Sequence, residues 1–147
     1  MKKILLGLAM LLMAVGVQAQ TAAGRTASTK VSDALGLMPA RDQAEFNRLM
    51  GDLVSTGASG VDMLTAMFDD TNNKEVSYAL SGWAAYVSAP GREEARRTFA
   101  EGIGRALKGC SDPVIEAYYI RLLQRCGGDE SVALLGSYLK DEQLGDP

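Results

Sequence analysis

Apolar residues recur at spacings of three and four from residue 41 onward, which is the period of an amphipathic α-helix. Glycine, proline and runs of Asp and Asn interrupt this pattern at short intervals, so it predicts several helices rather than one long helix. No stretch alternates with a period of two, and no turn has the form of a hairpin between strands. The pattern predicts an all-α fold of about six helices, within residues 41–54, 61–68, 76–87, 92–109, 113–126 and 129–139.

The fifth of these helices has the clearest start signal. Asp112 is a residue type that caps helix N-termini, and Pro113 follows it where the first helical turn tolerates proline. Gly127 and Gly128 mark its end. Because the connections between the predicted helices are short, successive helices must run antiparallel.

Separate parts of the sequence also resemble one another, as expected for an internal repeat. Residues 61–70 align without a gap on residues 132–141, which lie 71 positions later, and Val76 matches Val114 at an offset of 38. Two steps of about 35 residues would account for the larger offset, and self-similarity at a period of about 20–50 residues is typical of solenoids. A non-repetitive bundle of similar amphipathic helices would give the same pattern and stays open.

Two segments resemble a known family. Residues 111–117, Ser-Asp-Pro-Val-Ile-Glu-Ala, and residues 144–147, Leu-Gly-Asp-Pro, resemble the start of the second helix of a HEAT repeat. The resemblance covers residues 57–147, about two and a half repeats, and residues 41–54 suit the second helix of a capping unit. It implies an α-α superhelix (a HEAT/ARM-like solenoid) of antiparallel helix pairs that acts as a scaffold for protein partners. The family's usual arginine has no counterpart here, so armadillo-type and generic helical hairpins stay open.

The first residues have the form of a secretion signal. Lys2 and Lys3 precede an apolar run over residues 4–17, and Ala19 stands where a signal peptidase would cut. That run of 14 residues is too short to cross about 30 Å of hydrocarbon as a helix. We therefore expect a signal peptide over residues 1–19, export to the periplasm or the exterior of a bacterial cell, and no stable membrane span.

The remainder divides into two parts by composition. The segment 20–40 begins with a stretch rich in Thr, Ala, Ser and Gly, which predicts a flexible lead-in. Residues 41–147 then form the HEAT-like repeat domain, with the last repeat incomplete.

The charge balance argues against a nucleic-acid partner. The chain has 15 basic and 18 acidic residues, and loss of Lys2 and Lys3 with the signal peptide leaves a net charge near −5. Affinity for nucleic acid comes mainly from clustered Lys and Arg on phosphates.

The sequence predicts no catalytic, cofactor-binding or metal-binding residue. It contains no histidine, which removes Ser-His-Asp and Cys-His arrangements and the usual His-bearing metal sites. Residues 69–75 resemble a calcium loop, but Lys74 takes the place of the required Gly and Leu80 that of the bidentate Glu. Gly102 and Gly104 resemble part of a phosphate loop without the strand before it. We expect these glycines to allow close approach of a neighbouring helix or to mark a bend in their own helix.

The two cysteines are not expected to form a disulfide bond. Cys110 precedes the predicted fifth helix and Cys126 lies near its end. A helix of that length separates them by roughly 24 Å, whereas bridged Cα atoms lie within about 7 Å of each other. The prediction is therefore two free or buried thiols.

The largest side chains divide into core and surface candidates. Trp83 and Tyr118 fall at core-facing positions of their helices. Tyr86 and Tyr119 lie nearer the helix edges, on the second helices of the units, and the second helices of HEAT-like units form the inner layer. We therefore expect Tyr86 and Tyr119 on a concave surface that binds a protein partner, where Tyr is often favoured.

The fourth helix carries most of the candidate charge contacts. Glu93 stands four residues before Arg97, and Glu101 four before Arg105, the order that favours ion pairs on a solvent-exposed face. A second interpretation makes the arginines of its first turns a contact for an anionic partner, namely Arg92, Arg96 and Arg97.

The leading hypothesis is an exported scaffold that binds a protein partner through its inner helix layer, without catalysis of its own. One alternative is a small carboxylate-dependent enzyme on an α/α scaffold, since two helices can bring two acids together. Another is the N-terminal cap of a larger exported repeat protein, because residues 144–147 have the form of a helix start. The helix over 129–139 would then expose an apolar face, open to further repeats or to self-association with a second copy.

Overall fold

The computed structural model describes residues 24–69 and 73–139. Within them the fold is all-α, as predicted, and no strand occurs. The predicted signal peptide and the terminal residues 144–147 lie outside the described residues. No described helix is long and apolar enough to cross a membrane. The described helices are α2 (Ala27–Gly36), α3 (Gln43–Val54), α4 (Ala58–Met67), α5 (Lys74–Val87), α6 (Glu93–Gly109), α7 (Pro113–Cys126) and α8 (Asp129–Tyr138).

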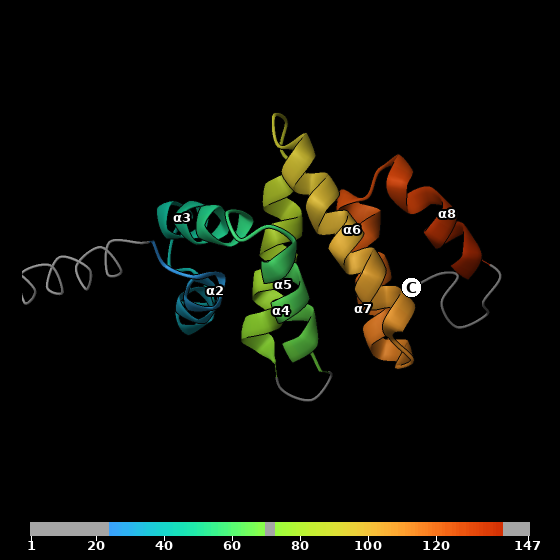
Figure 1. Ribbon diagram of the computed structural model, residues 1–147, viewed down its shortest axis with the longest axis horizontal. Coiled ribbons are helices and arrows are strands. Elements are labelled where there is room, and N and C mark those ends of the chain that lie inside the picture. The colour runs from blue at the N-terminus through green and yellow to red at the C-terminus, as the bar shows by residue number, and fades with distance from the viewer. Residues whose placement is uncertain (1–23, 70–72, 140–147) are drawn as a thin grey trace, which may run out of the picture.

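These helices form a row (Figure 1). α2 and α3 lie at one end and α8 at the other, with α4, α5, α6 and α7 between them. From α4 to α8 the chain reverses direction after each helix, so successive helices run antiparallel, as the short connections predict. α2 and α3 lie crosswise to this direction (Figure 1).

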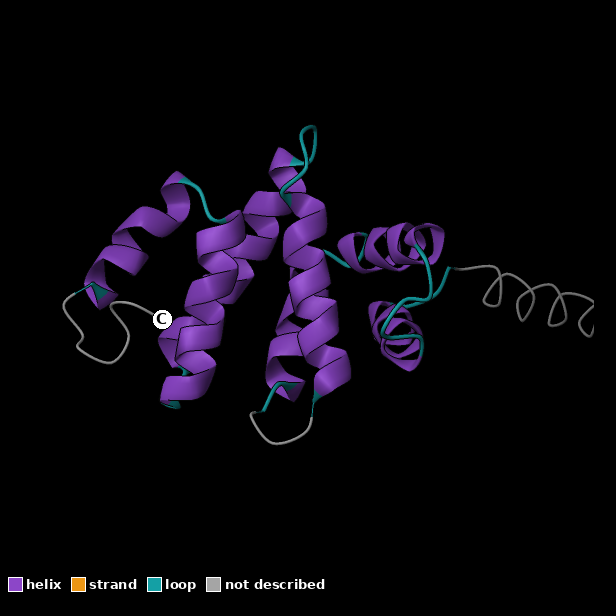
Figure 2. Cartoon of the chain, turned by 180° about the vertical axis from the view of Figure 1, so that it is seen from behind, coloured by secondary structure: helices purple, strands orange, loops and turns teal. Residues whose placement is uncertain are grey.

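The packing contacts divide the row into two layers. α2, α4, α6 and α8 pack one against the next, and α3, α5 and α7 do the same. The two layers meet where α2 packs on α3 and α5, and where α6 packs on α5 and α7. Figure 2 shows the same row from behind, with the helices joined by short loops. We call α3, α5 and α7 the odd-numbered layer.

The core lies where the two layers meet. Trp83 on α5 is 1% exposed, and its ring centroid lies 5.4 Å from that of Phe99 on α6. Trp83 is therefore a core residue, as the pattern predicts. Its indole nitrogen is buried and has no hydrogen-bond partner among the described residues. The remaining large buried side chains come from both layers and include Leu49, Met50, Leu53, Leu64, Leu80, Ile103, Leu107 and Leu123.

The expectation of a flexible lead-in over residues 20–40 is wrong for α2. This helix begins after Thr26, whose hydroxyl oxygen accepts a hydrogen bond from the backbone N–H of Thr29 at 3.2 Å. Val31 and Ala34 bury one side of it, where it packs on α3, α4 and α5. Tertiary packing of this short apolar side stabilises a helix that its own composition does not favour.

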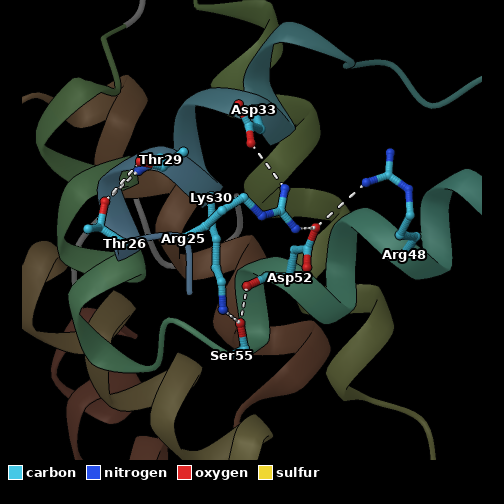
Figure 3. Close-up of polar contacts among 8 residues, drawn as sticks. All are labelled: Arg25, Thr26, Thr29, Lys30, Asp33, Arg48, Asp52 and Ser55. Atoms are coloured by element: carbon cyan, nitrogen blue, oxygen red, sulfur yellow. Dashed lines mark hydrogen bonds and ion pairs between the residues drawn. The ribbon is translucent and has the colours of Figure 1, made fainter. Parts of the chain in front are cut away.

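A group of polar contacts joins α2 to α3 (Figure 3). The guanidinium of Arg25 lies between two carboxylates, 3.0 Å from Asp33 and 2.8 Å from Asp52. Lys30 lies in the first turn of α2, and its ammonium donates to the hydroxyl of Ser55 at 2.6 Å. These groups are largely exposed, and exposed ion pairs typically contribute about 0–1 kcal/mol each. The contacts therefore fix the position of α2 more than they stabilise it.

The start of α3 is capped from both directions. The carboxylate of Asp42 accepts a hydrogen bond from the backbone N–H of Glu45 at 2.8 Å. The carboxylate of Glu45 in turn accepts from the backbone N–H of Arg41 at 2.9 Å and from its guanidinium at 2.8 Å. The hydrogen bond from the Arg41 side chain, followed by that from its backbone, lowers the pKa of Glu45 to about 2.

We expect Glu45→Gln to lower the free energy of unfolding near neutral pH, and this loss to shrink as the pH falls. The pKa of Glu45 is depressed from 4.5 to about 2 in the folded chain. Its stabilisation is therefore fully present above the unfolded value and disappears as the pH falls through the folded value. Urea unfolding followed by circular dichroism at about pH 7, 4 and 2.5 measures the difference.

Arg41→Gln is the matched control for this pH dependence, because it removes the guanidinium that lowers the pKa of Glu45. The Arg41→Gln variant should likewise lose stability least at the lowest pH. Parallel stability profiles for wild type and Glu45→Gln across this range would contradict the assignment.

The cap of α7 and the state of the cysteines are as predicted. The carboxylate of Asp112 accepts from the backbone N–H of Val114 at 2.9 Å and of Ile115 at 3.3 Å. Cys110 and Cys126 lie at opposite ends of α7, and both thiols are free. Burial raises the pKa of the Cys126 thiol to about 11, so this thiol is a packing group rather than a nucleophile.

The glycines of α6 allow close approach of neighbouring helices, as predicted. A Cβ atom at Gly102 would lie 2.6 Å from Cγ1 of Val61 on α4. A Cβ atom at Gly104 would lie 3.3 Å from Cδ2 of Leu134 on α8. α6 therefore packs closely on both of its neighbours in the same layer.

Candidate functional site

Tyr119 does not lie on a surface, so the expectation that it lies on a concave partner surface is wrong. Its side chain is 2% exposed, and its ring centroid lies 5.9 Å from that of Phe68. Burial raises the pKa of its hydroxyl to about 12. Its neighbour Tyr118 is half-buried, and its hydroxyl donates to the carbonyl of Ser77 at 2.9 Å. Tyr119 is part of the core.

Tyr86 and Arg92 form one contact. The guanidinium carbon of Arg92 lies 3.5 Å from the centroid of the Tyr86 ring, in a cation–π arrangement. The same guanidinium donates to the backbone carbonyl of Tyr86 at 2.5 Å. The Tyr86 ring also makes an edge contact with Phe46 on α3, with the two ring centroids 6.4 Å apart. Tyr86 is half-buried, and Arg92 holds the loop between α5 and α6 against it.

Arg96 and Arg97 have different environments from Arg92 and from each other. The guanidinium of Arg96 donates to the carbonyl of Cys126 at 2.9 Å and to the carboxylate of Glu130 at 2.6 Å. Arg96 therefore joins α8 to the rest of the row. Arg97 is exposed and forms no ion pair with a described residue. Arg92 and Arg96 are thus already engaged within the chain, and of the three only Arg97 presents an unpaired charge.

The predicted ion pairs along α6 do not form. The carboxylate of Glu93 accepts instead from the backbone N–H of Gly91 at 2.9 Å, ahead of the helix. The guanidinium of Arg105 lies 3.0 Å from Asp62 on α4. Glu93 and Arg105 therefore contact the residues before the helix and the neighbouring α4 rather than the partners four positions away.

A groove that the sequence does not directly indicate lies on the odd-numbered layer. It measures about 450 Å³ and lies between α5, the start of α3 with the connection that precedes it, and the end of α7. We call it the odd-layer groove. Its apolar lining comprises Met38, Pro39, Ala40, Phe46, Tyr78 and Ala85.

Three small residues of α5 keep the odd-layer groove open. Ser81, Gly82 and Ala85 line it one and two turns after Tyr78. A Cβ atom at Gly82 would lie 3.1 Å from the ring of Phe46. A glycine here therefore lets α3 approach α5 closely while the surface above them stays hollow.

The polar groups around the odd-layer groove are mostly used within the chain. The hydroxyl of Ser81 lies 2.9 Å from that of Tyr118, and Asp42 caps α3. Arg125 is a lining residue of the groove, and its side chain forms no ion pair with a described residue. Tyr78 is 50% exposed at its edge. The groove therefore presents an apolar surface, a tyrosine and one unpaired cation.

A larger hollow of about 600 Å³ lies at the start of α6. Glu93, Glu94 and Arg92 line it together with Trp83. Both carboxylates would disfavour an anion at this helix N-terminus, and Glu93 already accepts from Gly91. This hollow gives no ligand class.

Within the described residues, no three His, Cys, Asp or Glu side chains gather as a group able to hold a metal ion. Comparison with models of known protein families, with curated proteins and with solved structures finds no match to this chain. The candidate site therefore depends on the geometry of the odd-layer groove alone.

Proposed function

We propose that this chain is an exported helical-repeat scaffold that holds a segment of a protein partner in the odd-layer groove and catalyses no reaction of its own. The observation that carries the proposal is the groove itself, an open apolar hollow edged by an exposed tyrosine and an unpaired arginine. Aromatic residues and arginine are enriched in protein interfaces, where they contribute most of the binding energy.

The order of helix packing supports a HEAT-like solenoid. Such a stack has one layer of first helices and one of second helices, each packing on the next. We take α4–α5 and α6–α7 as the complete pairs of such a stack, because α4 packs on α6 and α5 packs on α7. α2 and α3 then act as an N-terminal cap that lies crosswise to the pairs. The odd-layer groove lies on the layer of second helices.

The openness of the groove favours a protein segment over a small molecule. Sites for small molecules bury most of the ligand surface, whereas this groove is open to solvent. An apolar side chain of a larger partner would fill it, while the rest of that partner covers Tyr78 and the adjacent helices.

The test is cross-linking from a defined position in the bacterial host. A photoreactive phenylalanine analogue replaces Tyr78 at the groove or, as the control, Ala66, which is exposed on α4 in the other layer. We expect a defined protein adduct from position 78 and none from position 66. Ala85→Arg, which fills the groove, should remove the adduct without changing the thermal unfolding midpoint by more than a few degrees. The adduct should contain the chain processed to Gln20.

Two results would contradict the proposal. One is an identical set of adducts from both positions, which would indicate collisions rather than binding. The other is an adduct from position 78 that persists in the Ala85→Arg variant.

A further inference from the structure

We infer that the partner segment carries a carboxylate beside the apolar side chain that enters the odd-layer groove, and that Arg121 and Arg125 of α7 bind it. This inference rests on the proposed function, since it names the chemistry of the partner for the same groove. It follows from where unpaired cations lie on the odd-numbered layer.

The arginines of this chain are mostly paired. Five of them lie within 4.0 Å of a carboxylate, namely Arg25, Arg41, Arg48, Arg96 and Arg105. Arg92 stacks on Tyr86 instead. Among the described residues the other three, Arg97, Arg121 and Arg125, form no ion pair, although acidic residues outnumber basic ones in the chain. Two of these three lie together on α7.

Arg121 and Arg125 belong to one side of α7. They continue the line of Val114 and Tyr118 at spacings of four, three and four, which places the four residues along one side of the helix. Tyr118 packs toward α5 and contacts the hydroxyl of Ser81, a groove residue. Arg125 lines the groove itself, and Val114 is 61% exposed at the far end. The arginines therefore lie beside the groove and not on the opposite side of the row.

Among the described residues, no acidic side chain of the groove lining is free to bind these arginines. Asp42 is the one acid in the lining, and its carboxylate accepts from a backbone N–H at the start of α3. Glu116 lies two residues from Tyr118, which puts it on a different side of α7. At the start of α5, the opposite charges of Lys74 and Glu75 offset each other. The α7 side of the groove is therefore basic, although the chain is acidic overall.

A partner segment with an acid beside an apolar side chain fits both the arginines of α7 and the apolar lining of the groove. The planar guanidinium of arginine binds a carboxylate through two parallel hydrogen bonds, which fixes the orientation of the segment. The apolar lining takes a neighbouring Phe, Leu or Met side chain. A segment with the apolar side chain but without the acid would keep the hydrophobic contact and lose the hydrogen bonds to the arginines that orient it.

The test selects peptides from a displayed library of random dodecamers on the purified chain. Clones that bind wild type but not Ala85→Arg are groove-dependent. We expect these clones to carry Asp or Glu within a few residues of an aromatic or aliphatic side chain. Their dissociation constants should rise about tenfold in Arg121→Gln/Arg125→Gln. Arg97→Gln, which removes an exposed and unpaired arginine from α6, is the matched control and should leave affinity unchanged.

Replacing the acid of a selected peptide by its amide gives the complementary measurement. The amide peptide should bind wild type about tenfold more weakly and lose nothing further in the double arginine variant, since both changes remove the same contact. Circular dichroism checks that the variants fold.

The outcomes separate the inference from the proposed function. Groove-dependent peptides without an acidic preference would overturn the inference and leave the scaffold function standing. A failure to select any groove-dependent peptide would overturn both. Sedimentation of the free chain covers a third case: if Ala85→Arg converts a dimer to a monomer, the occupant is a second copy and the inference is wrong.

Discussion

Replacing Gly102 with Ala should lower the free energy of unfolding by up to about 2 kcal/mol. The added Cβ would lie 2.6 Å from Cγ1 and 3.0 Å from Cβ of Val61, which is 0% exposed on α4. Val61 is β-branched, so its χ1 angle cannot change freely to make room, and α4 must shift relative to α6. Overpacking of this kind costs about 1–3 kcal/mol, of which the better helix propensity of Ala recovers about 1 kcal/mol.

Gly51→Ala is the matched control, because the same substitution in the middle of α3 meets no atom within 4 Å. It should raise the free energy of unfolding by about 0.5–1 kcal/mol through helix propensity alone. Urea unfolding measures both variants. In a Val61→Ala background, Gly102→Ala should lose most of its cost, since the clashing methyl groups are gone. Equal stabilisation by both glycine substitutions would contradict the close approach of α4 and α6.

The positions of most helices are predictable from the sequence because their signals are local. Six helices follow the apolar period and end at glycine, proline or polar residues, and each described bound lies within three residues of the prediction. The cap at Asp112 and the separation of the two cysteines follow from the same local rules.

Other features depend on contacts between distant segments, which the sequence does not reveal. α2 has no clear local signal in the sequence. Its only buried residues are Val31 and Ala34, and they lie in a stretch of polar and small residues. Arg105 pairs with Asp62, which is 43 positions away, because α4 packs beside α6. An i,i+4 rule considers only one helix, so it assigns this arginine to the wrong acid.

For a related reason, the sequence pattern assigns some residues wrongly to the surface or to the core. Helical periodicity predicts one buried side, but α7 packs on α5, α6 and α8, so its buried arc is wide enough to include Tyr119. Conversely, Val114 and Val132 lie in the apolar pattern near the first turns of α7 and α8, where they are mostly exposed.

The candidate groove has only a faint signal in the sequence. Its walls come from residues 38–46 and from α5 and α7, which only the packing brings together. The small residues Ser81, Gly82 and Ala85 at helical spacing after Tyr78 are the single local feature. Small residues at such spacing also occur in plain helix–helix contacts, so they do not predict a groove without the positions of α3 and α7.

Replacing Trp83 with Ala should destabilise the chain more than Gly102→Ala does, by about 3–5 kcal/mol. Trp83 is 1% exposed, contacts Phe99, and lies within reach of α4, where a Cβ at Gly60 would meet its ring at 3.2 Å. Its removal leaves a cavity between the two layers that the surrounding helices fill only in part. Since domains of this size have a free energy of unfolding of about 5–15 kcal/mol, this loss is a large fraction of the total, and the variant should unfold at a clearly lower temperature and urea concentration than wild type.

Trp83→Phe separates the volume of this side chain from its nitrogen. The indole N–H is buried without an acceptor among the described residues, and an unsatisfied buried donor costs about 1–3 kcal/mol. Phe removes that donor and keeps a ring against Phe99, so its loss of stability should be much smaller than that of Ala. Circular dichroism must follow the unfolding, because Trp83 is the only tryptophan and its fluorescence is lost in both variants. If Trp83→Phe and Trp83→Ala lower the free energy of unfolding equally, the indole nitrogen has an acceptor in solution, and the core around Trp83 differs from the one described.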